Sequence, residues 1–274
     1  MSFCLLHSTA SMSKLCQTFE NLAIKTWFDL GDSHKSNLMI GEESITDFLL
    51  LHLYRNHQQE VTIKKFNKQN EEPKTGADWE WWFVSGNQSF GMRVQAKRLK
   101  TDTLNYVKLG KKVGATKTMQ VDRLINSAKR NQCFPIYCFY NYWATSSFVP
   151  KQRCPHLMPF TCLYGCAVAD AREVRLLVKA KKRSLVAFAP HLWPWMCLVC
   201  CTNQPSNNSS LAERVRAFAV NLARDKTEVP DVRTSPPVYV SALIGKSLET
   251  NVDTALPDKD VAGILVIQER KEEG

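Results

Sequence analysis

The sequence has no hydrophobic run long enough to cross a membrane. Its longest apolar stretch, Leu185 to Cys201, is interrupted by Pro190, His191 and Pro194. A membrane-spanning helix needs about 20 consecutive, mainly apolar residues. We therefore expect no membrane partner. Internal repeats and low-complexity tracts are also missing.

The first residues, MSFCLLHSTASM, lack the basic stretch that precedes the apolar part of a secretory signal peptide. We therefore expect a cytoplasmic protein whose ten cysteines are free thiols, because disulfides are rare in the reducing cytosol. Residues 1–11 are either a leader or a segment that precedes the true start. The sequence leaves both Met1 and Met12 open as the start.

Two common ligand-binding signatures are missing as well. No GxxxxGK[ST] motif is present, so coupling to ATP would need a partner chain. One set of possible zinc ligands lacks the usual pair of short, closely spaced motifs. This set consists of Cys154, His156, Cys162, Cys166, Cys197 and Cys200. We expect buried thiols at these cysteines and no zinc site.

The sequence does contain enough apolar residues for a core, and it has an excess of positive charge. Of the 274 residues, 44% are hydrophobic, which suits one sizeable core or one core with an appended subdomain. The formal net charge is +10. Basic proteins often bind polyanions, although charge alone does not specify the partner.

Hydrophobic spacing predicts a compact α/β core within residues 42–142. The stretch GEESITDFLLLHLYRNH is typical of a helix and EVTIKKFNK of a strand, and residues 77–84 and 90–98 favour a two-stranded hairpin. A helix at 117–130 and the buried strand FPIYCFYNY follow. The predicted order is helix, three strands, helix, strand, in about 100 residues, which is within the usual range for a domain.

The regions on either side of this core are less regular. Residues 1–41 are expected to hold the leader and one amphipathic helix that begins near Met12. Residues 143–274 are expected to form a mixed α+β extension of unknown role. Its elements would be a strand near Gly165–Val168, a helix at 210–224 and a last strand at AGILVIQE.

One acidic residue opens a strand that is largely apolar on both faces. Side chains alternate along a strand, so Asp78 and Glu80 share a face, and a hairpin would bring Gln95 and Lys97 beside Asp78. A buried carboxylate needs a partner, and a buried Asp78–Lys97 ion pair without chemistry would supply one. Alternatively, the Asp and Gln oxygens would bind Mg²⁺, and the lysine would position a water or stabilise a pentavalent phosphate.

These residues resemble the motif of the PD-(D/E)XK nuclease superfamily, in particular its Mrr-like branch, where the second half-motif is Gln-x-Lys. Asp78 in GADWEWW matches the motif aspartate, and Gln95 and Lys97 in QAK match the second half-motif. The resemblance covers residues 42–141 and includes the order of helices and strands. It implies a restriction-endonuclease-like core.

The resemblance also implies a metal ligand on the first helix, where the family often has a glutamate. GEESITD supplies Glu42 and Glu43, and we expect Glu43 to be the ligand, because we place it nearer the helix start. Gln95 replaces the commoner Asp or Glu, which lowers the negative charge available to the metal. Glu80 is either a further ligand or the partner of Arg93.

Positive charge is concentrated directly after the motif. Residues 91–130 contain eleven Lys or Arg and two acidic residues, so the local net charge is +9. Clustered cations bind the phosphates of nucleic acids, although a basic run is also typical of a solvated surface. We expect phosphate contacts from Arg98, Lys100, Lys108, Lys111, Lys112, Lys117, Arg123 and Arg130.

The helix that follows this basic segment has Gln120 on the same polar face as Arg123 and Arg130. It resembles in part the Gln-x-x-x-Tyr motif of some exonucleases in the superfamily, with Leu124 in place of the tyrosine. We expect Gln120 either to lie at the surface or to support the metal ligands.

The sequence thus leads to the hypothesis of a metal-dependent endodeoxyribonuclease. Asp78, Gln95, Glu43 and the Ala96 carbonyl would hold Mg²⁺ or Mn²⁺, and Lys97 would orient the attacking water. The resemblance implies double-stranded DNA as substrate and a role in restriction or anti-phage defence. A catalytically inactive nucleic-acid-binding or protein-interaction module and an RNA-directed nuclease stay open as alternatives. So does a homodimer, or a partner chain that supplies activation.

Overall fold

The structure is a computed structural model that describes residues 13–66, 77–113, 118–144, 160–200, 209–245 and 261–269. Some residues singled out in the sequence lie outside these ranges, namely Met1, Met12, Lys117, Cys154 and His156.

The helices are α1 (Lys14–Lys35), α2 (Glu42–Asn56), α3 (Gln120–Arg130), α4 (Ala171–Lys179), α5 (Leu185–Phe188), α6 (Cys197–Cys200), α7 (Leu211–Leu222) and α8 (Val238–Gly245). The short 3₁₀ helices are η1 (Thr161–Gly165), η2 (Ala189–His191) and η3 (Lys226–Glu228). Within the described ranges, no helix is both long and apolar enough to cross a membrane. The strands are β1 (Val61–Lys65), β2 (Trp79–Ser85), β3 (Gln88–Arg98), β4 (Lys112–Val113), β5 (Thr118–Met119), β6 (Phe134–Tyr140), β7 (Cys166–Asp170), β8 (Trp193–Pro194) and β9 (Gly263–Glu269).

Seven strands form one mixed sheet in the order β1-β9-β2-β3-β6-β7-β8. β2 and β3 pair as an antiparallel hairpin, and β6 runs parallel to β3. β4 and β5 form a separate two-stranded ribbon before α3. The predicted α/β class is confirmed, and α2, β1, β2, β3, α3 and β6 occur in the order that the hydrophobic pattern predicted, except that β4 and β5, which were not predicted, lie between β3 and α3.

The last strand, β9, lies inside the sheet. It pairs antiparallel with β1 and parallel with β2. A glycine suits this position, because a Cβ added at Gly263 would lie 2.6 Å from the Lys64 carbonyl oxygen and would also overlap the Trp79 ring. Strands from both sides of the expected boundary at residues 142 and 143 therefore belong to one sheet.

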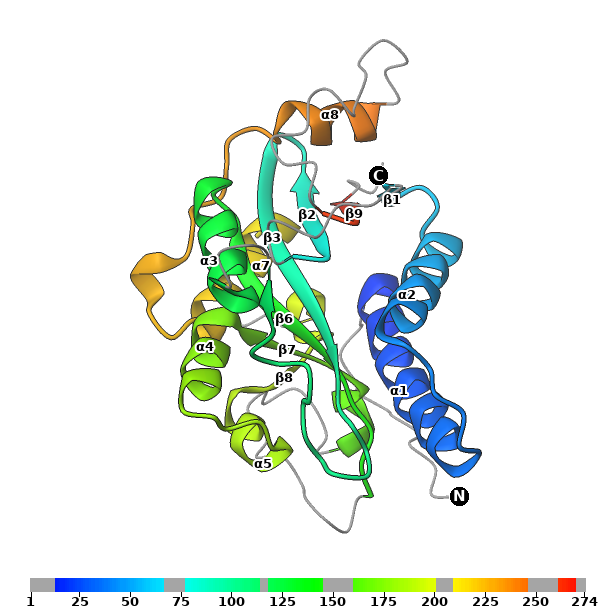
Figure 1. The fold of residues 1–274 in the computed structure, drawn as a ribbon. Coiled ribbons are helices and arrows are strands. Elements are labelled where there is room, and N and C mark those ends of the chain that lie inside the picture. Colours follow the sequence, from blue (N-terminus) through cyan, green and yellow to red (C-terminus); the bar gives the residue numbers. More distant parts are fainter. Residues whose placement is uncertain are drawn as a thin grey trace.

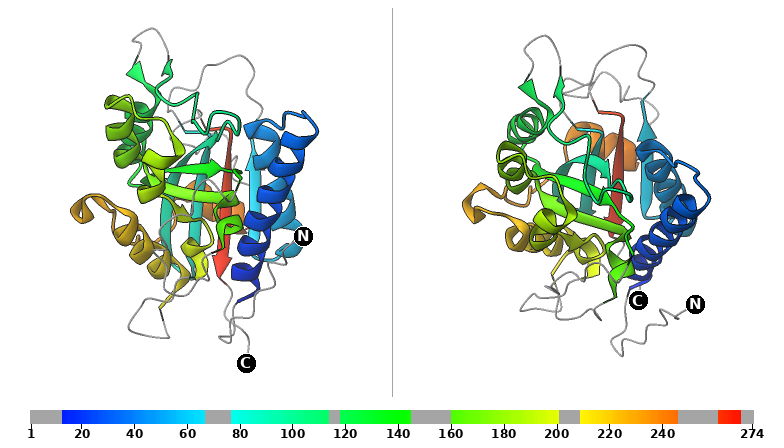
Figure 2. Two further views of the ribbon diagram at one scale, coloured as in Figure 1. Left: turned by 90° about the horizontal axis from the view of Figure 1, so that it is seen from below. Right: turned by 60° about the horizontal axis from the view of Figure 1, so that its bottom comes forward.

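Helices cover both faces of this sheet. α1, α2, α6 and α7 pack on the face that carries Trp79, Trp81 and Phe83, whereas α3, α4 and α8 pack on the opposite face. Figure 1 shows α1 and α2 on one side of the strands and α3 and α4 on the other. Figure 2 shows the same layers from two further directions, with β9 in red among the strands. The central strands are therefore buried on both faces.

The sequence of β2 explains its central place. All six residues from Trp79 to Val84 are buried. Aromatic and β-branched side chains favour a pleated, buried strand, and a strand covered on both faces can be apolar at every position. The strand therefore places Asp78, just before it, at the edge of a dry interior.

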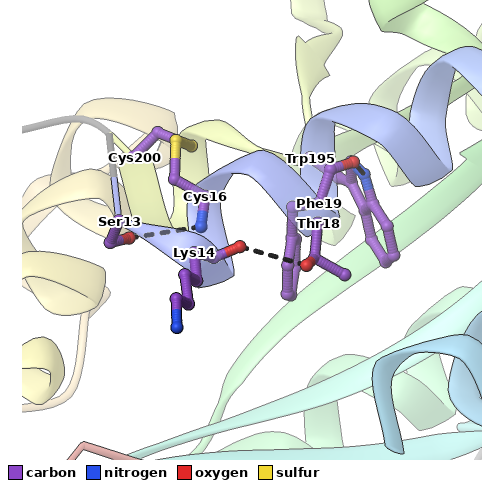
Figure 3. The surroundings of a disulfide bond; sticks show 7 residues. All are labelled: Ser13, Lys14, Cys16, Thr18, Phe19, Trp195 and Cys200. Atoms are coloured by element: carbon purple, nitrogen blue, oxygen red, sulfur yellow. Dashed lines mark hydrogen bonds between the residues drawn. A yellow bond between two sulfur atoms is a disulfide. The ribbon is translucent and has the colours of Figure 1, made fainter. Parts of the chain in front are cut away.

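A disulfide joins the first helix to α6. Cys16 in α1 bonds Cys200, 184 residues later, with the two Cα atoms 5.1 Å apart. Figure 3 shows this bond near Trp195, whose indole N–H donates to the Phe19 carbonyl oxygen at 2.7 Å. The expectation of free thiols is wrong for this pair. The other described cysteines are buried thiols outside this disulfide, namely Cys133, Cys138, Cys162, Cys166 and Cys197.

Candidate active site

The β2–β3 hairpin brings Asp78 and Gln95 into direct contact. The Asp78 amide donates to the Val94 carbonyl oxygen at 2.8 Å, and its own carbonyl oxygen accepts from the Ala262 amide at 2.6 Å. Its carboxylate Oδ2 accepts from the Ala96 amide at 3.0 Å and from Gln95 Nε2. Strand alternation therefore placed these two side chains correctly. The segment just before β9 also helps to hold the aspartate.

Gln95 links Asp78 to Gln120 through a chain of side-chain hydrogen bonds. Gln95 is buried on β3, where its Nε2 donates to Asp78 and to the Ala96 carbonyl oxygen at 3.1 Å. Its Oε1 accepts from Gln120 Nε2 at 2.6 Å. Gln120 opens α3, and its amide donates to the Lys111 carbonyl oxygen at 2.9 Å. Gln120 is thus a buried support for Gln95 and not a surface residue.

The glutamate that reaches this site from α2 is Glu42, not Glu43. Its Oε2 lies 4.0 Å from Lys97 Nζ, and its Oε1 accepts from the Arg98 amide at 3.2 Å. Glu43 is exposed. The expectation for Glu43 is corrected because α2 begins at Glu42, after the N-cap Gly41, and one helical step turns a side chain by about 100°. Glycine is a favourable N-cap residue, so Gly41 in the sequence already indicated that the helix begins at Glu42.

A buried contact fixes the first turn of α2 against the sheet. The Thr46 hydroxyl donates to the Glu42 carbonyl oxygen at 2.9 Å and lies 2.8 Å from the Tyr140 hydroxyl on β6. Residues four apart lie one above the other on a helix face. Anchoring Thr46 to Tyr140 therefore also holds Glu42 over the end of β3.

Lys97 lies buried between two carboxylates and the basic loop that follows β3. Only 5% of the residue is exposed. Burial lowers the pKa of its ammonium group below that of an ordinary lysine, because a charge is less stable away from water. Asp78 and Glu42 oppose this shift in pKa, and Lys108 and Lys111 add to it. The charge on Lys97 is therefore stabilised by the two carboxylates and destabilised by the loop lysines.

Glu80 is engaged elsewhere on the same face of the sheet. Its Oε2 lies 2.6 Å from Arg93 Nε, and its Oε1 accepts from Trp82 Nε1 at 2.5 Å and from the Tyr239 hydroxyl. All four side chains are buried. Of the two roles considered for Glu80, the structure has the pairing with Arg93. This network attaches α8 to the sheet.

The basic residues expected to contact phosphates differ in their surroundings. Four of them are exposed between β3 and the β4–β5 ribbon or within it, namely Lys100, Lys108, Lys111 and Lys112. Arg130 is exposed at the end of α3, and Arg123 is half-buried. The Arg98 guanidinium donates to the Ile40 carbonyl oxygen at 2.8 Å, so Arg98 braces the segment before α2.

The described part of the chain contains no group of three or more His, Cys, Asp or Glu side chains arranged to hold a metal ion. Of the cysteines considered for zinc, Cys162, Cys166 and Cys197 are buried thiols and Cys200 is in the disulfide. A metal ion near Lys97 would therefore be bound by the carboxylates of Asp78 and Glu42 together with neutral oxygens. These would be the side-chain oxygen of Gln95 and the carbonyl oxygen of Ala96.

One family match covers nearly the whole chain. Residues 15–273 match the family described as "Family of unknown function (DUF6615)". The chain belongs to this family. The match to DUF6615 includes every residue of the candidate site, from Glu42 to Gln120, and extends through β9. Searches of curated proteins and of solved structures found no match.

Proposed function

We propose that this protein is a metal-dependent nuclease that hydrolyses the phosphodiester bonds of double-stranded DNA. Its restriction-endonuclease-like core would consist of α2, β1, β2, β3, α3 and β6. The observation that carries the proposal is the convergence of Asp78, Gln95, Lys97 and Glu42 at the open end of the β2–β3 hairpin. These are the residue types of the PD-(D/E)XK motif, and they come from the expected elements.

The oxygens at this site suit Mg²⁺ or Mn²⁺, which are hard cations that prefer oxygen ligands. Asp78 Oδ2 and the Ala96 carbonyl oxygen both accept from Gln95 Nε2, so two oxygens already converge on one atom. Reversal of the Gln95 amide would add its Oε1 to them. Gln120 would then reverse too, and its oxygen would accept from Gln95. Glu42 would contribute directly or through a water.

The protein's own side chains would do most of the positioning. Lys97 would donate hydrogen bonds to the attacking water and balance negative charge on the phosphate in the transition state. Glu42 would hold the Lys97 ammonium in place, since the two groups are 4.0 Å apart. Burial would strengthen these interactions, because charges act more strongly away from bulk water. Bound Mg²⁺ would supply a Lewis acid for the phosphate oxygens.

The loop after β3 would hold the DNA backbone beside this site. Lys108 and Lys111 are exposed, yet they lie near enough to Lys97 to affect its pKa. Cations at such positions attract phosphates irrespective of base sequence. Phosphates bound by these lysines would therefore lie next to the scissile bond.

A catalytically inactive DNA-binding module on the same fold is the second candidate. It is favoured by the small number of acidic groups, because the described residues supply only Asp78 and Glu42 at this site and Gln95 is neutral. A role in restriction or anti-phage defence follows from the family resemblance alone, as does activation by a homodimer or a partner chain.

The test is to incubate the purified protein with supercoiled plasmid, linear duplex DNA and duplex RNA, each with Mg²⁺, Mn²⁺ or EDTA. We expect metal-dependent cleavage of DNA, which Asp78→Ala and Lys97→Ala abolish while circular dichroism stays unchanged. DNA binding without cleavage would favour the inactive module. Cleavage of RNA alone would make RNA the substrate, and equal cleavage by the wild type and both variants would place the activity elsewhere.

A further inference from the structure

A second basic cluster lies at the end of α4 and in the turn before α5. Its members are all exposed, namely Lys179, Lys181, Lys182 and Arg183. The segment of residues 175–192 contains no Asp or Glu. In the sequence this cluster is far from the candidate site, and we call it the α4–α5 basic turn.

Backbone contacts join this turn to the loop that follows β3. The Tyr106 amide donates to the Arg183 carbonyl oxygen at 2.9 Å, and the Leu185 amide donates to the Leu104 carbonyl oxygen at 2.8 Å. Asn105 forms an isolated β-bridge with Ser184. The two segments are therefore held side by side as a paired unit.

The side chain of Arg183 extends this contact toward the candidate site. Its Nη2 lies 3.0 Å from the point where a Cβ would stand at Gly110. Gly110 lies between Lys108 and Lys111, the two lysines that act electrostatically on Lys97. Positive charge thus continues from Lys97, through the loop lysines, to the α4–α5 basic turn.

The cations of this turn are available for an external anion. Within the ranges that the structure describes, no carboxylate lies within salt-bridge distance of any of the four. Their neighbour Arg175 differs, because its Nη1 lies 3.9 Å from Asp122 Oδ1. Uncompensated cations side by side repel one another, and a polyanion relieves that repulsion.

The backbone of Lys181 adds an independent observation. α4 ends in a Schellman arrangement, in which the Lys181 amide donates to Val178 O at 3.0 Å and the Lys182 amide to Leu177 O at 2.9 Å. Lys181 has a φ of 56°, at the position where glycine is strongly preferred. A lysine is less stable than glycine in this conformation. Residues in unfavourable backbone conformations cluster at functional sites, so a lysine where glycine is favoured suggests a function for the lysine side chain.

We propose that the α4–α5 basic turn is a second DNA-binding arm, which contacts backbone phosphates of the same duplex that the loop lysines hold beside Lys97. This role rests on the proposed nuclease function, but it is a statement about binding and can be measured without cleavage. Duplex DNA carries one charge per about 1.7 Å of its axis, so a continuous line of cations can follow successive phosphates.

The test compares two full-length triple variants with the wild type. Lys179→Gln/Lys181→Gly/Lys182→Gln removes three charges from the turn and supplies the glycine that the backbone favours. The control Lys14→Gln/Lys25→Gln/Arg55→Gln removes three exposed charges from α1 and α2, which lie on the other side of the sheet (Figure 1). Fluorescence anisotropy gives the Kd for labelled duplex DNA and duplex RNA in EDTA over a series of salt concentrations.

We expect the turn variant to bind duplex DNA at least about tenfold more weakly, with a salt slope smaller by roughly 2 to 3, because each phosphate contact contributes about 0.9 to that slope. The control should keep the wild-type values. The turn variant should also have a Tm no lower than that of the wild type, which excludes misfolding as the cause.

Several results would contradict the proposal that the α4–α5 basic turn binds DNA. They are an unchanged Kd and slope in the turn variant, an equal loss in the control, a loss for RNA only, or no DNA binding by the wild type. The nuclease proposal fails separately. If the wild type binds DNA through this turn but cleaves nothing with Mg²⁺ or Mn²⁺, the binding arm stands and the catalytic assignment does not.

Discussion

At the residue scale, adjacent glutamates at the start of α2 form a matched pair. Glu42 contacts Lys97 and the Arg98 amide, whereas Glu43 is exposed. We predict that Glu42→Gln lowers the rate of Mg²⁺-dependent plasmid cleavage by about 10- to 100-fold, as expected for a group that holds or orients metal-site residues. Glu43→Gln should cleave at close to the wild-type rate. A larger loss for Glu43→Gln would restore the original expectation from the sequence.

Glu20 provides a test of pH dependence. It is buried in α1, and burial raises the pKa of its carboxyl group. The folded state then holds its proton more tightly than the unfolded state. This group therefore lowers the free energy of unfolding as the pH rises from its ordinary pKa through the raised one. The cost persists at neutral pH and disappears below the ordinary pKa of a glutamate.

We therefore predict that Glu20→Gln gains stability relative to the wild type as the pH rises from acid to neutral. Urea unfolding over this pH range measures the difference. Glu43→Gln removes an exposed carboxylate and should show no comparable trend. A constant difference between Glu20→Gln and the wild type at every pH would contradict the assignment of a raised pKa.

The residues of the site were predictable to different degrees. Asp78, Gln95 and Lys97 followed from strand alternation, because a period of two leaves only one choice of face. Glu42 was missed by one residue, since the direction of a helical side chain depends on where the helix begins. The contact between Gln120 and Gln95 depends on how α3 packs on β3, which no local pattern contains.

At the element scale, β9 depends on Gly263. A Cβ there would lie 2.6 Å from the Lys64 carbonyl oxygen and overlap the Trp79 ring. We predict that Gly263→Ala lowers the free energy of unfolding by about 1–3 kcal/mol, the usual cost of overpacking a core. Gly245→Ala is the control, because none of the described residues comes within 4 Å of its added Cβ. Equal stability of the two variants in urea unfolding would argue against β9 between β1 and β2.

The helices and strands were largely predictable from the sequence, but the pairing of distant segments with one another was not. The stretch AGILVIQE correctly predicted a strand, and β9 indeed spans Gly263–Glu269. Its insertion between β1 and β2 is a pairing between residues about 200 positions apart, as in Val61 with Ile267. Such pairing is decided by the assembled sheet and by closure of a long loop, not by local propensity. The same holds for the bridge between Asn105 and Ser184.

At the scale of the whole molecule, the Cys16–Cys200 bond closes a loop of 184 residues. Such a link restricts the unfolded chain and typically contributes about 2–4 kcal/mol. We predict that reductant lowers the Tm of the wild type, and that Cys16→Ser has this lower Tm with or without reductant. A Tm of the wild type that does not respond to reductant would show that the bond contributes nothing to stability.

This bond also bears on the expected cytoplasmic location, because disulfides rarely persist in a reducing cytosol. Mass spectrometry of the protein, alkylated at the moment of cell lysis, shows whether Cys16 and Cys200 are joined in the cell. A bonded pair would favour an oxidising compartment, and free thiols would agree with the cytoplasm. The sequence suggested free thiols because it shows neither the packing of α1 nor that of α6.

The proposed nuclease activity depends on chemistry at Asp78 and Lys97. The most direct measurement is the initial rate of Mg²⁺-dependent plasmid cleavage by the wild type, Asp78→Asn and Lys97→Met, purified in parallel. We predict that the wild type cleaves and that each variant is at least about a hundredfold slower, while both variants still bind duplex DNA in EDTA. Cleavage by either variant at the wild-type rate, or no cleavage by the wild type with either Mg²⁺ or Mn²⁺, would contradict it.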